Sequence, residues 1–416
     1  MIDSKGENAG VLSARPLLVR DPDGSLRLPA LATVHSHAFQ RAMRGLAQRP
    51  VAASDDFWSW RGQMYSLASS LTPESMHAAS LAAFRELARA GVRTVGEFHY
   101  VHHQADGTPY DQRTLLADVV IDAARQAGLR VALLRAAYHR AGPGRDAEPG
   151  QRRFCDPRVD DVLRDVDALR AKWTGDPDVV VGVAAHSVRA VPPSWLAPLR
   201  DYATRHGTML HMHVAEVARE VDECVAETGR RPVELLADQG LLSDRFVAVH
   251  GTNLLPHEAR LLGDARAFVC VCATTERDLG DGLPDLTALR TAGARLCIGV
   301  DSYALVDPIE DLRALETHER LRTRARVTFR PAHGTPAEQL WREGSLEGAA
   351  ACGFADAGGH VVVRRDHPAL ALVGDEFLLD AVVFGCGAGV IERLDRDEAR
   401  ETPRDAKPPS RQAKRE

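Results

Sequence analysis

No stretch of this 416-residue sequence stays apolar for the roughly 20 residues that a membrane-spanning helix requires. The N-terminus also lacks the apolar segment of a signal peptide. The net charge is only −6, and no long basic block interrupts the mixture of charges before the C-terminal tail. These absences exclude a membrane protein and a nucleic-acid-binding protein, and we expect a cytoplasmic location.

Cysteine is scarce as well. Seven cysteines, an odd number, do not suggest a disulfide framework. Cys270 and Cys272 lie two residues apart in an apolar run and are expected to be buried thiols on one face of a strand. The rest of the composition, 44% hydrophobic and 26% charged, is that of a globular protein with one large domain or one large and one small.

Between residues 28 and 303, eight short apolar runs alternate with amphipathic segments. Continuous apolar runs are typical of parallel strands that are covered on both faces. The expected strands are 31–37, 92–100, 129–138, 179–186, 208–214, 246–250, 267–273 and 295–301. Eight such units predict an α/β fold of the (β/α)8 TIM-barrel type, with a doubly wound open sheet as the alternative.

The ends of the intervening helices can be predicted from the sequence. Thr72 is expected to cap a helix that starts with Pro73 and ends near Gly91. Further helices are expected to stop at glycines in the left-handed conformation, namely Gly128, Gly207, Gly240 and Gly263.

The two chain ends are predicted to build a reduced accessory β layer beside the barrel. Residues 1–27 are assigned to this layer, 28–350 to the barrel and 351–391 to a C-terminal accessory segment. Three apolar runs in or near that segment, HVVV (360–363), ALALV (369–373) and LLDAVVFG (378–385), are expected to be strands. The charged residues 392–416 are predicted to be a disordered tail.

Polar residues stand at the C-terminal ends of the expected strands, the face on which barrel enzymes build their sites. Because residues i and i+2 of a strand point the same way, His35 and His37 can hold one metal ion from one side. His213, His250 and Asp301 end later strands and can converge on the same ion. Imidazoles with one carboxylate suit a catalytic zinc with an open position, and Fe²⁺ or Mn²⁺ are alternatives.

A second His-x-His pair, His211 and His213, leaves the choice of ligand open. His213 is preferred because Glu216, three residues later, places a carboxylate near the same ion. A buried Asp301 at the end of an apolar run costs free energy unless it is paired, hydrogen-bonded or metal-bound, which strengthens its assignment as a ligand.

These groups predict hydrolysis of a C–N bond. A divalent ion lowers the pKa of bound water towards ~7, and Asp301 is placed to accept the proton of that water. Glu216 is expected to deliver a proton to the departing nitrogen, and His250 to polarise the attacked centre or orient the water. The alternatives are a solvated Glu216 on the first turn of a helix and a His250 satisfied within the core.

Seven segments together resemble one family: HSHAFQR (35–41), DDFWSWR (55–61), EFHYVHH (97–103), GQRRF (150–154), AAHSVRAV (184–191), HMHVAE (211–216) and TTERDLGDG (274–282). This family, the N-formimino-L-glutamate (formimidoylglutamate) deiminases, belongs to the amidohydrolase superfamily, and the resemblance runs through most of residues 28–350. It implies a single zinc ion per chain held by His35, His37, His213 and Asp301, with Glu216 and His250 catalytic. It also implies that Gln40, Arg61, Tyr100, His186 and Arg189 hold the substrate.

The reaction that the resemblance implies converts N-formimino-L-glutamate to N-formyl-L-glutamate and ammonia in histidine degradation. The substrate is a small-molecule amidine with two carboxylates, which arginine grips bidentately. Arg61, flanked by Trp58 and Trp60, and Arg189 suit that role. The resemblance also implies a homodimer.

Three departures from the family pattern keep other functions open. Only about 30 residues precede His35, too few for most of the family's N-terminal β layer, and the C-terminal region is short. The family usually has Asp-Ser-His after the eighth strand, whereas this chain has Asp301-Ser302-Tyr303, so we expect Tyr303 to reshape the pocket. The alternatives are an amidohydrolase that deaminates another amidine, a guanidine or an amino-heterocycle, and a non-catalytic metal-binding barrel.

Overall fold

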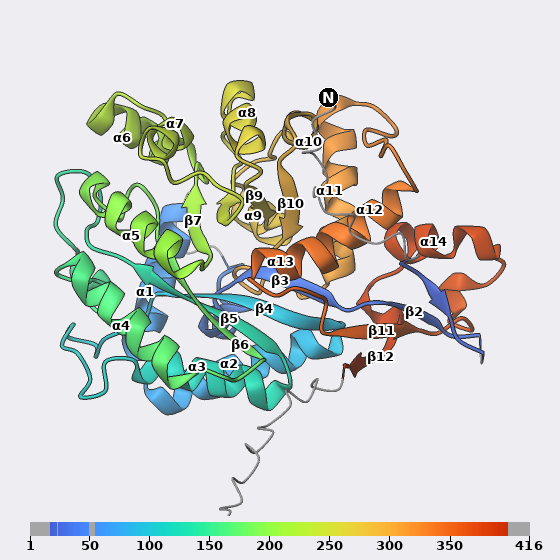
Figure 1. Cartoon of the computed structure of the whole chain (residues 1–416), viewed down its shortest axis with the longest axis horizontal. Helices are drawn as coiled ribbons and strands as arrows, with labels where there is room; N and C mark the ends of the chain where they lie inside the picture. The colour runs from blue at the N-terminus through green and yellow to red at the C-terminus, as the bar shows by residue number, and fades with distance from the viewer. Residues whose placement is uncertain (1–16, 23, 50–54, 398–416) are drawn as a thin grey trace, which may run out of the picture.

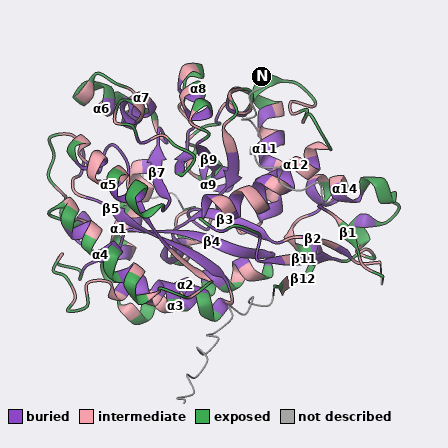
Figure 2. Cartoon of the chain, in the orientation of Figure 1, coloured by how far each residue is buried: buried purple, intermediate pink, exposed green. Residues whose placement is uncertain are grey.

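Eight parallel strands form one sheet with helices around it in the computed structural model, which describes residues 17–22, 24–49 and 55–397 (Figure 1). The strands are β3 (Leu31–Ser36), β4 (Val92–His99), β5 (Arg130–Ala137), β6 (Val179–Ala185), β7 (Leu210–Val214), β8 (Phe246–His250), β9 (Phe268–Val271) and β10 (Arg295–Ile298). Each expected strand coincides with one of these. They are buried along nearly their whole length, whereas the outer faces of the helices are exposed (Figure 2).

The first and last strands of this sheet meet and close it. The sheet runs in chain order from β3 to β10, and Ser36 and Asp301 form a parallel bridge between its ends. The amide of His37 donates to the carbonyl of Asp301 at 3.1 Å, and the amide of Asp301 donates to the carbonyl of His35 at 3.0 Å. The predicted (β/α)8 barrel is therefore confirmed, and the open sheet is wrong.

Helices connect successive strands and cover the barrel. They are α1 (Phe57–Ser70), α2 (Pro73–Arg89), α3 (Leu115–Ala127), α4 (Val159–Lys172), α5 (Pro193–His206), α6 (Ala218–Thr228), α7 (Pro232–Asp238), α8 (Pro256–Asp264), α9 (Ala273–Leu279), α10 (Leu286–Ala292) and α11 (Pro308–Thr323). Thr72 caps α2 by accepting from the amide of Ser75. Gly128 and Gly207 end α3 and α5 at φ angles of 76° and 59°, as expected.

Gly263 does not end its helix, so that prediction is wrong. Helix α8 continues to Asp264. A Cβ atom at Gly263 would lie 2.0 Å from the carbonyl oxygen of Ala292, the last residue of α10. Glycine is required here because the two helices approach each other closely, and not because the chain turns.

We expect Gly263→Ala to lower the free energy of unfolding by about 1–3 kcal/mol, because the new methyl group must push α8 and α10 apart. Denaturant unfolding followed by circular dichroism measures this change. Gly62→Ala is the matched control, since Gly62 lies inside α1 with open space around its Cβ position. That control is expected to gain about 0.4–1 kcal/mol. Equal effects of the two substitutions would contradict the packing argument.

A four-stranded antiparallel sheet lies beside the barrel and joins the two chain ends (Figure 1). Its order is β1 (Val19–Arg20), β2 (Leu26–Pro29), β11 (Gly359–Val363) and β12 (Ile391–Arg396). The predicted accessory β layer is therefore present. Strand β2 crosses the boundary that we placed after residue 27, and β12 crosses the one after residue 391. Residues 392–396 thus belong to a strand, and the predicted tail from residue 398 onwards lies outside the described residues.

Two of the three apolar runs expected as C-terminal strands are not strands. HVVV lies in β11, but residues 368–370 form the 3-10 helix η4 (Pro368–Leu370), and residues 378–385 form α14 (Leu378–Gly385). In α14 the buried residues fall on one helical face, namely Leu378, Leu379, Val382 and Val383. This face packs against α11 and α12 (Pro336–Arg342), so tertiary packing rather than the local run of apolar residues decides its structure.

The seven cysteines are all free, and Cys270 and Cys272 are buried as expected. Within the described part of the chain, no helix is both long and apolar enough to cross a bilayer.

Candidate active site

Three histidines and one aspartate meet at the C-terminal mouth of the barrel. Nε2 of His35 lies 3.1 Å from Nε2 of His37 and 3.1 Å from Nε2 of His213. Oδ1 of Asp301 lies 3.5 Å from Nε2 of both His35 and His37. Ligands of a tetrahedral zinc at ~2.05 Å stand ~3.3 Å apart, so the spacing of these donors fits one such ion.

Hydrogen bonds at Nδ1, the other ring nitrogen, fix the orientation of two of these imidazole rings. Nδ1 of His37 lies 2.9 Å from the carbonyl of Phe98, and Nδ1 of His213 lies 2.7 Å from the carbonyl of His186. Because a carbonyl only accepts, Nδ1 carries the hydrogen, and the lone pair of Nε2 faces the centre of the cluster. Burial lowers the pKa of His35 to about 3 and also lowers the pKa of His37 and His213. The rings are therefore neutral, as metal binding requires.

His211 does not join this cluster. It lies on the same face of β7 as His213 but two residues earlier in the strand, and its Nε2 lies 2.9 Å from the carbonyl of Ala351. The structure thus brings together the four residues that the sequence analysis singled out and leaves the competing histidine elsewhere.

His250 sits beside the cluster among three carboxylates. Its Nε2 lies 3.5 Å from Glu216 and 3.8 Å from Asp301, and its Nδ1 lies 3.2 Å from Glu276. Burial alone would lower the pKa of His250, but these negative charges outweigh it and raise the pKa to about 10. The three carboxylates therefore favour the protonated form of this ring. Burial raises the pKa of Glu216 above its usual range.

Sequence reasoning missed Glu276. Its carboxylate accepts from the amide of Cys272 at 2.9 Å and anchors His250 from behind. The available signal was its position in the first turn of the helix after β9, inside the segment TTERDLGDG.

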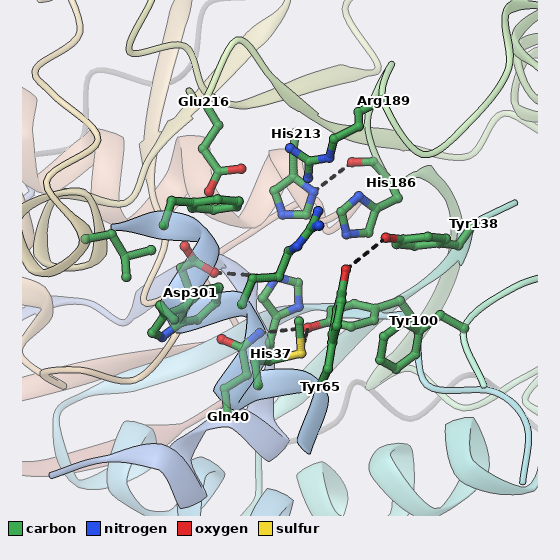
Figure 3. A pocket seen from close by; sticks show the side chains of 16 residues that line it. His37, Gln40, Tyr65, Tyr100, Tyr138, His186, Arg189, His213, Glu216 and Asp301 are labelled. Carbon is green, nitrogen blue, oxygen red and sulfur yellow. Dashed lines mark hydrogen bonds and ion pairs between the residues drawn. The ribbon is translucent and has the colours of Figure 1, made fainter. Parts of the chain in front are cut away.

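A pocket of about 490 Å³ opens directly over these groups (Figure 3). His37, His213, Glu216 and Asp301 line it. All five predicted substrate-binding residues also line the pocket: Gln40, Arg61, Tyr100, His186 and Arg189. They come from the 3-10 helix η1 (Ala38–Met43), from α1 and from the segments just after β4 and β6. The topology therefore gathers the predicted residues around a single cavity.

Two arginines give the pocket a cationic side. The guanidinium of Arg61 lies 4.4 Å from the ring centre of Trp58 and 5.3 Å from that of Tyr65. Arg189 is buried, with Nη1 3.9 Å from Glu220. Nη1 of Arg61 and both Nε and Nη1 of Arg189 are buried without a hydrogen-bond partner among the described residues. Buried donors without partners cost free energy, so these groups are suited to an anionic ligand.

Tyrosines and glutamines connect this cationic side with the rest of the pocket. Gln40 donates to the hydroxyl of Tyr100 at 2.7 Å. Gln151 donates to the hydroxyls of Tyr138 at 2.6 Å and Tyr65 at 3.0 Å. Tyr65, Tyr138 and Gln151 were missed as site residues, although Gln151 belongs to the recognised segment GQRRF.

The expectation that Tyr303 reshapes the pocket is wrong. Tyr303 is not among the described residues that line the cavity. Its side chain is fully buried, and its hydroxyl lies 2.8 Å from Oγ of Ser36. The positive φ of 60° at Tyr303 turns the chain so that this ring points away from the substrate side.

Comparison with known proteins agrees with this architecture. The amidohydrolase family model matches residues 26–366. Formimidoylglutamate deiminase from Pseudomonas aeruginosa is 38% identical over 305 residues, which are 73% of this chain and 66% of that protein, just under two thirds of its length. A 5-methylthioadenosine/S-adenosylhomocysteine deaminase from Syntrophobacter fumaroxidans is 27% identical over 348 residues, 83% of this chain and 71% of that protein.

A crystal structure of an amidohydrolase from Brucella melitensis has the same fold, with a TM-score of 0.80 and 34% sequence identity. The match covers 89% of this chain and 85% of that one. Since the family model covers well over half of the sequence and the barrel is shared, this protein belongs to the amidohydrolase family.

Proposed function

We propose that this protein hydrolyses N-formimino-L-glutamate to N-formyl-L-glutamate and ammonia, with one zinc ion per chain. The observation that carries the proposal is that two kinds of group line one pocket. Arg61 and Arg189 present buried donors without hydrogen-bond partners among the described residues, and the same pocket is lined by residues of the histidine and carboxylate cluster. A small amidine that also bears carboxylates matches both kinds of group. The 38% identity to a formimidoylglutamate deiminase supports the same substrate.

His35, His37, His213 and Asp301 would hold the metal ion, because their donor atoms converge and their rings are neutral. When bound, a divalent ion of this kind supplies Lewis acidity and lowers the pKa of a water molecule towards ~7. Imidazole and carboxylate ligands suit zinc, and Fe²⁺ and Mn²⁺ accept the same set.

Glu216 and Asp301 would move the protons. Glu216 lines the pocket, and burial raises its pKa and so favours the protonated form, which can give a proton to the nitrogen that departs. Asp301 lies 3.8 Å from the same Nε2 of His250 and would accept a proton from the attacking water. His250 lies between these groups, within 3.8 Å of both carboxylates, and would stabilise negative charge that develops there.

The proposed reaction balances with water as the only co-reactant. The oxygen of water forms a bond to the amidine carbon, and the bond from that carbon to the terminal nitrogen breaks. The nitrogen leaves as ammonia after receiving a proton, and the carbon keeps the oxygen as a formyl group. Arg61 and Arg189 would bind the carboxylates, and Gln40, Tyr100 and His186 would orient the part of the substrate between them.

Deamination of an amino-heterocycle is the second candidate. Six aromatic side chains line the pocket, namely Phe57, Trp60, Tyr65, Tyr100, Tyr138 and Phe154, and such walls suit a flat ring. The similarity to a 5-methylthioadenosine/S-adenosylhomocysteine deaminase points the same way. The buried donors of Arg61 and Arg189 favour the dicarboxylate, because a neutral heterocycle would leave these nitrogens without a hydrogen bond.

Ammonia release by purified, zinc-loaded protein tests the proposal. We expect release from N-formimino-L-glutamate, with N-formyl-L-glutamate identified by mass as the organic product. A panel of other amidines, guanidines and aminopurines is assayed beside it. Faster turnover of any panel member than of N-formimino-L-glutamate would overturn the assignment of the substrate, and no turnover by a folded, zinc-containing sample would overturn the proposed reaction.

A further inference from the structure

A buried chain of polar groups lies directly behind the metal-binding residues. The hydroxyl of Tyr303 is 2.8 Å from Oγ of Ser36, and Ser36 donates to Oε2 of Glu97 at 2.5 Å. The other carboxylate oxygen of Glu97 accepts from the amide of Ala38 at 2.9 Å. These three side chains are at most 2% exposed, so they bond to one another rather than to solvent.

The three residues of this network are next to the proposed metal ligands in the sequence or on the neighbouring strand. Ser36 stands between His35 and His37 at the end of β3, and Tyr303 stands two residues after Asp301, beyond β10. Glu97 is on β4, the neighbouring strand. The network therefore ties together the segments that carry three of the four proposed ligands, at the seam where the barrel closes.

The backbone where β3 meets β10 has an unfavourable conformation that must be stabilised by surrounding contacts. Asp301 and Tyr303 have φ angles of 50° and 60°, in the left-handed region that side chains other than glycine rarely adopt. A conformation of this kind persists only when its surroundings hold it in place. The carbonyl of Tyr303 accepts from Nε of Arg44 at 2.8 Å, and its hydroxyl is held by Ser36 at the other end.

Packing alone does not account for the polar atoms. A phenylalanine at 303 and an alanine at 36 would fill nearly the same volume without burying two hydroxyls. Polar groups in a buried network are costly unless every member is satisfied, and here they satisfy one another. Residues that orient metal ligands through hydrogen bonds contribute to metal affinity without touching the ion.

We propose that Tyr303, Ser36 and Glu97 are positioning residues that hold the ends of β3 and β10 in register so that His35, His37 and Asp301 converge on the metal ion. The inference rests on the metal site of the proposed function. It assigns these three residues no contact with the substrate or the reacting atoms.

Zinc affinity of the full-length protein, measured without substrate by competition with a chromophoric chelator, tests this role. We expect Ser36→Ala and Tyr303→Phe each to raise the zinc Kd on the order of 10-fold. The double variant should be only slightly worse than either single variant, because both substitutions break the same network. Two merely structural defects would instead add.

Two substitutions elsewhere provide matched controls. Ser345 is a buried serine in the segment 343–347 that packs against β3 and β10, but its hydroxyl donates to the carbonyl of Trp341 and not to the network. The hydroxyl of Tyr202 donates to Asp167, also outside the network. Ser345→Ala and Tyr202→Phe remove one buried or partly buried hydroxyl bond each and should leave the zinc Kd unchanged. Circular dichroism of the metal-free proteins shows which variants are folded, and Glu97→Gln replaces any single variant that is not.

A zinc Kd within twofold of wild type in the folded network variants would overturn the proposal, as would an equal loss in the controls. Because the measurement needs no substrate, a tenfold loss supports the network even if the wild-type protein does not act on N-formimino-L-glutamate. Failure of the reaction and failure of the positioning role are thus separate results.

Discussion

Replacing Glu216 by glutamine is expected to lower kcat for ammonia release by about 10²–10⁴-fold, the usual contribution of a positioned proton donor. The amide keeps the size of the side chain but carries no transferable proton to the departing nitrogen. Glu216 lies beside the ligand cluster and is not one of the converging ligands, so the zinc content should stay at one ion per chain. Steady-state ammonia release and elemental analysis of the same sample measure the two quantities.

The matched control is Glu234→Gln. Glu234 also pairs with a histidine, since its carboxylate lies 2.8 Å from Nε2 of His257, but this pair is on the surface near α7 and α8. Its removal should leave kcat unchanged. A Glu216→Gln variant that retained more than about a tenth of wild-type kcat would exclude the proton-transfer role, whereas loss of zinc together with activity would show that Glu216 holds the metal.

Replacing Arg189 by alanine is expected to lower kcat/KM for N-formimino-L-glutamate by roughly 10- to 150-fold, mainly through a higher KM. Charge-assisted hydrogen bonds contribute about 1.5–3 kcal/mol each, which corresponds to that range. Nε and Nη1 of Arg189 are buried and unpartnered in the described structure, so a carboxylate is the group that they would bind. An analogue in which the side-chain or α-carboxylate is replaced by an amide should lose less on the same substitution.

Arg189→Ala also leaves Glu220 buried next to an empty position, 3.9 Å from the former guanidinium. Burial raises the pKa of Glu220 to about 7, and an unpaired buried carboxylate is destabilising. The double variant Arg189→Ala/Glu220→Gln removes this charge and should regain thermal stability while keeping the high KM. Arg200→Ala, at a partly exposed arginine that pairs with Asp201, serves as the control for removing an arginine. An unchanged KM in the single and the double variant would remove the proposed carboxylate contact.

Much of the barrel was readable from local patterns in the sequence. Continuous apolar runs located all eight strands, because a parallel strand covered on both faces has no polar side to interrupt it. Thr72 and Gly128 marked helix ends in the sequence. The hydroxyl of threonine can accept a hydrogen bond from a backbone amide of the first turn, and glycine can adopt the left-handed conformation that ends a helix. The order of strands in a closed parallel barrel follows the chain, so residues that end strands had to meet at one mouth.

The C-terminal region shows where local patterns failed. The run LLDAVVFG is apolar enough for a strand, but it forms α14 because one helical face packs against α11 and α12. Gly263 looks like a helix end in the sequence, but it lies inside α8 where the backbone of α10 comes too close for a side chain. Both outcomes depend on neighbours that are distant in the sequence.

The sequence by itself determined the barrel, the strand ends and the set of histidines and carboxylates at its mouth, because periodicity and chain order are local properties. Only the tertiary structure decided which side chains turn into the pocket. It placed Tyr65 and Tyr138 in the pocket, set Glu276 behind His250, and turned Tyr303 away from the substrate into the network with Ser36. The physical reason is that the direction of a loop side chain depends on backbone angles and contacts supplied by other strands, which no run of neighbouring residues encodes.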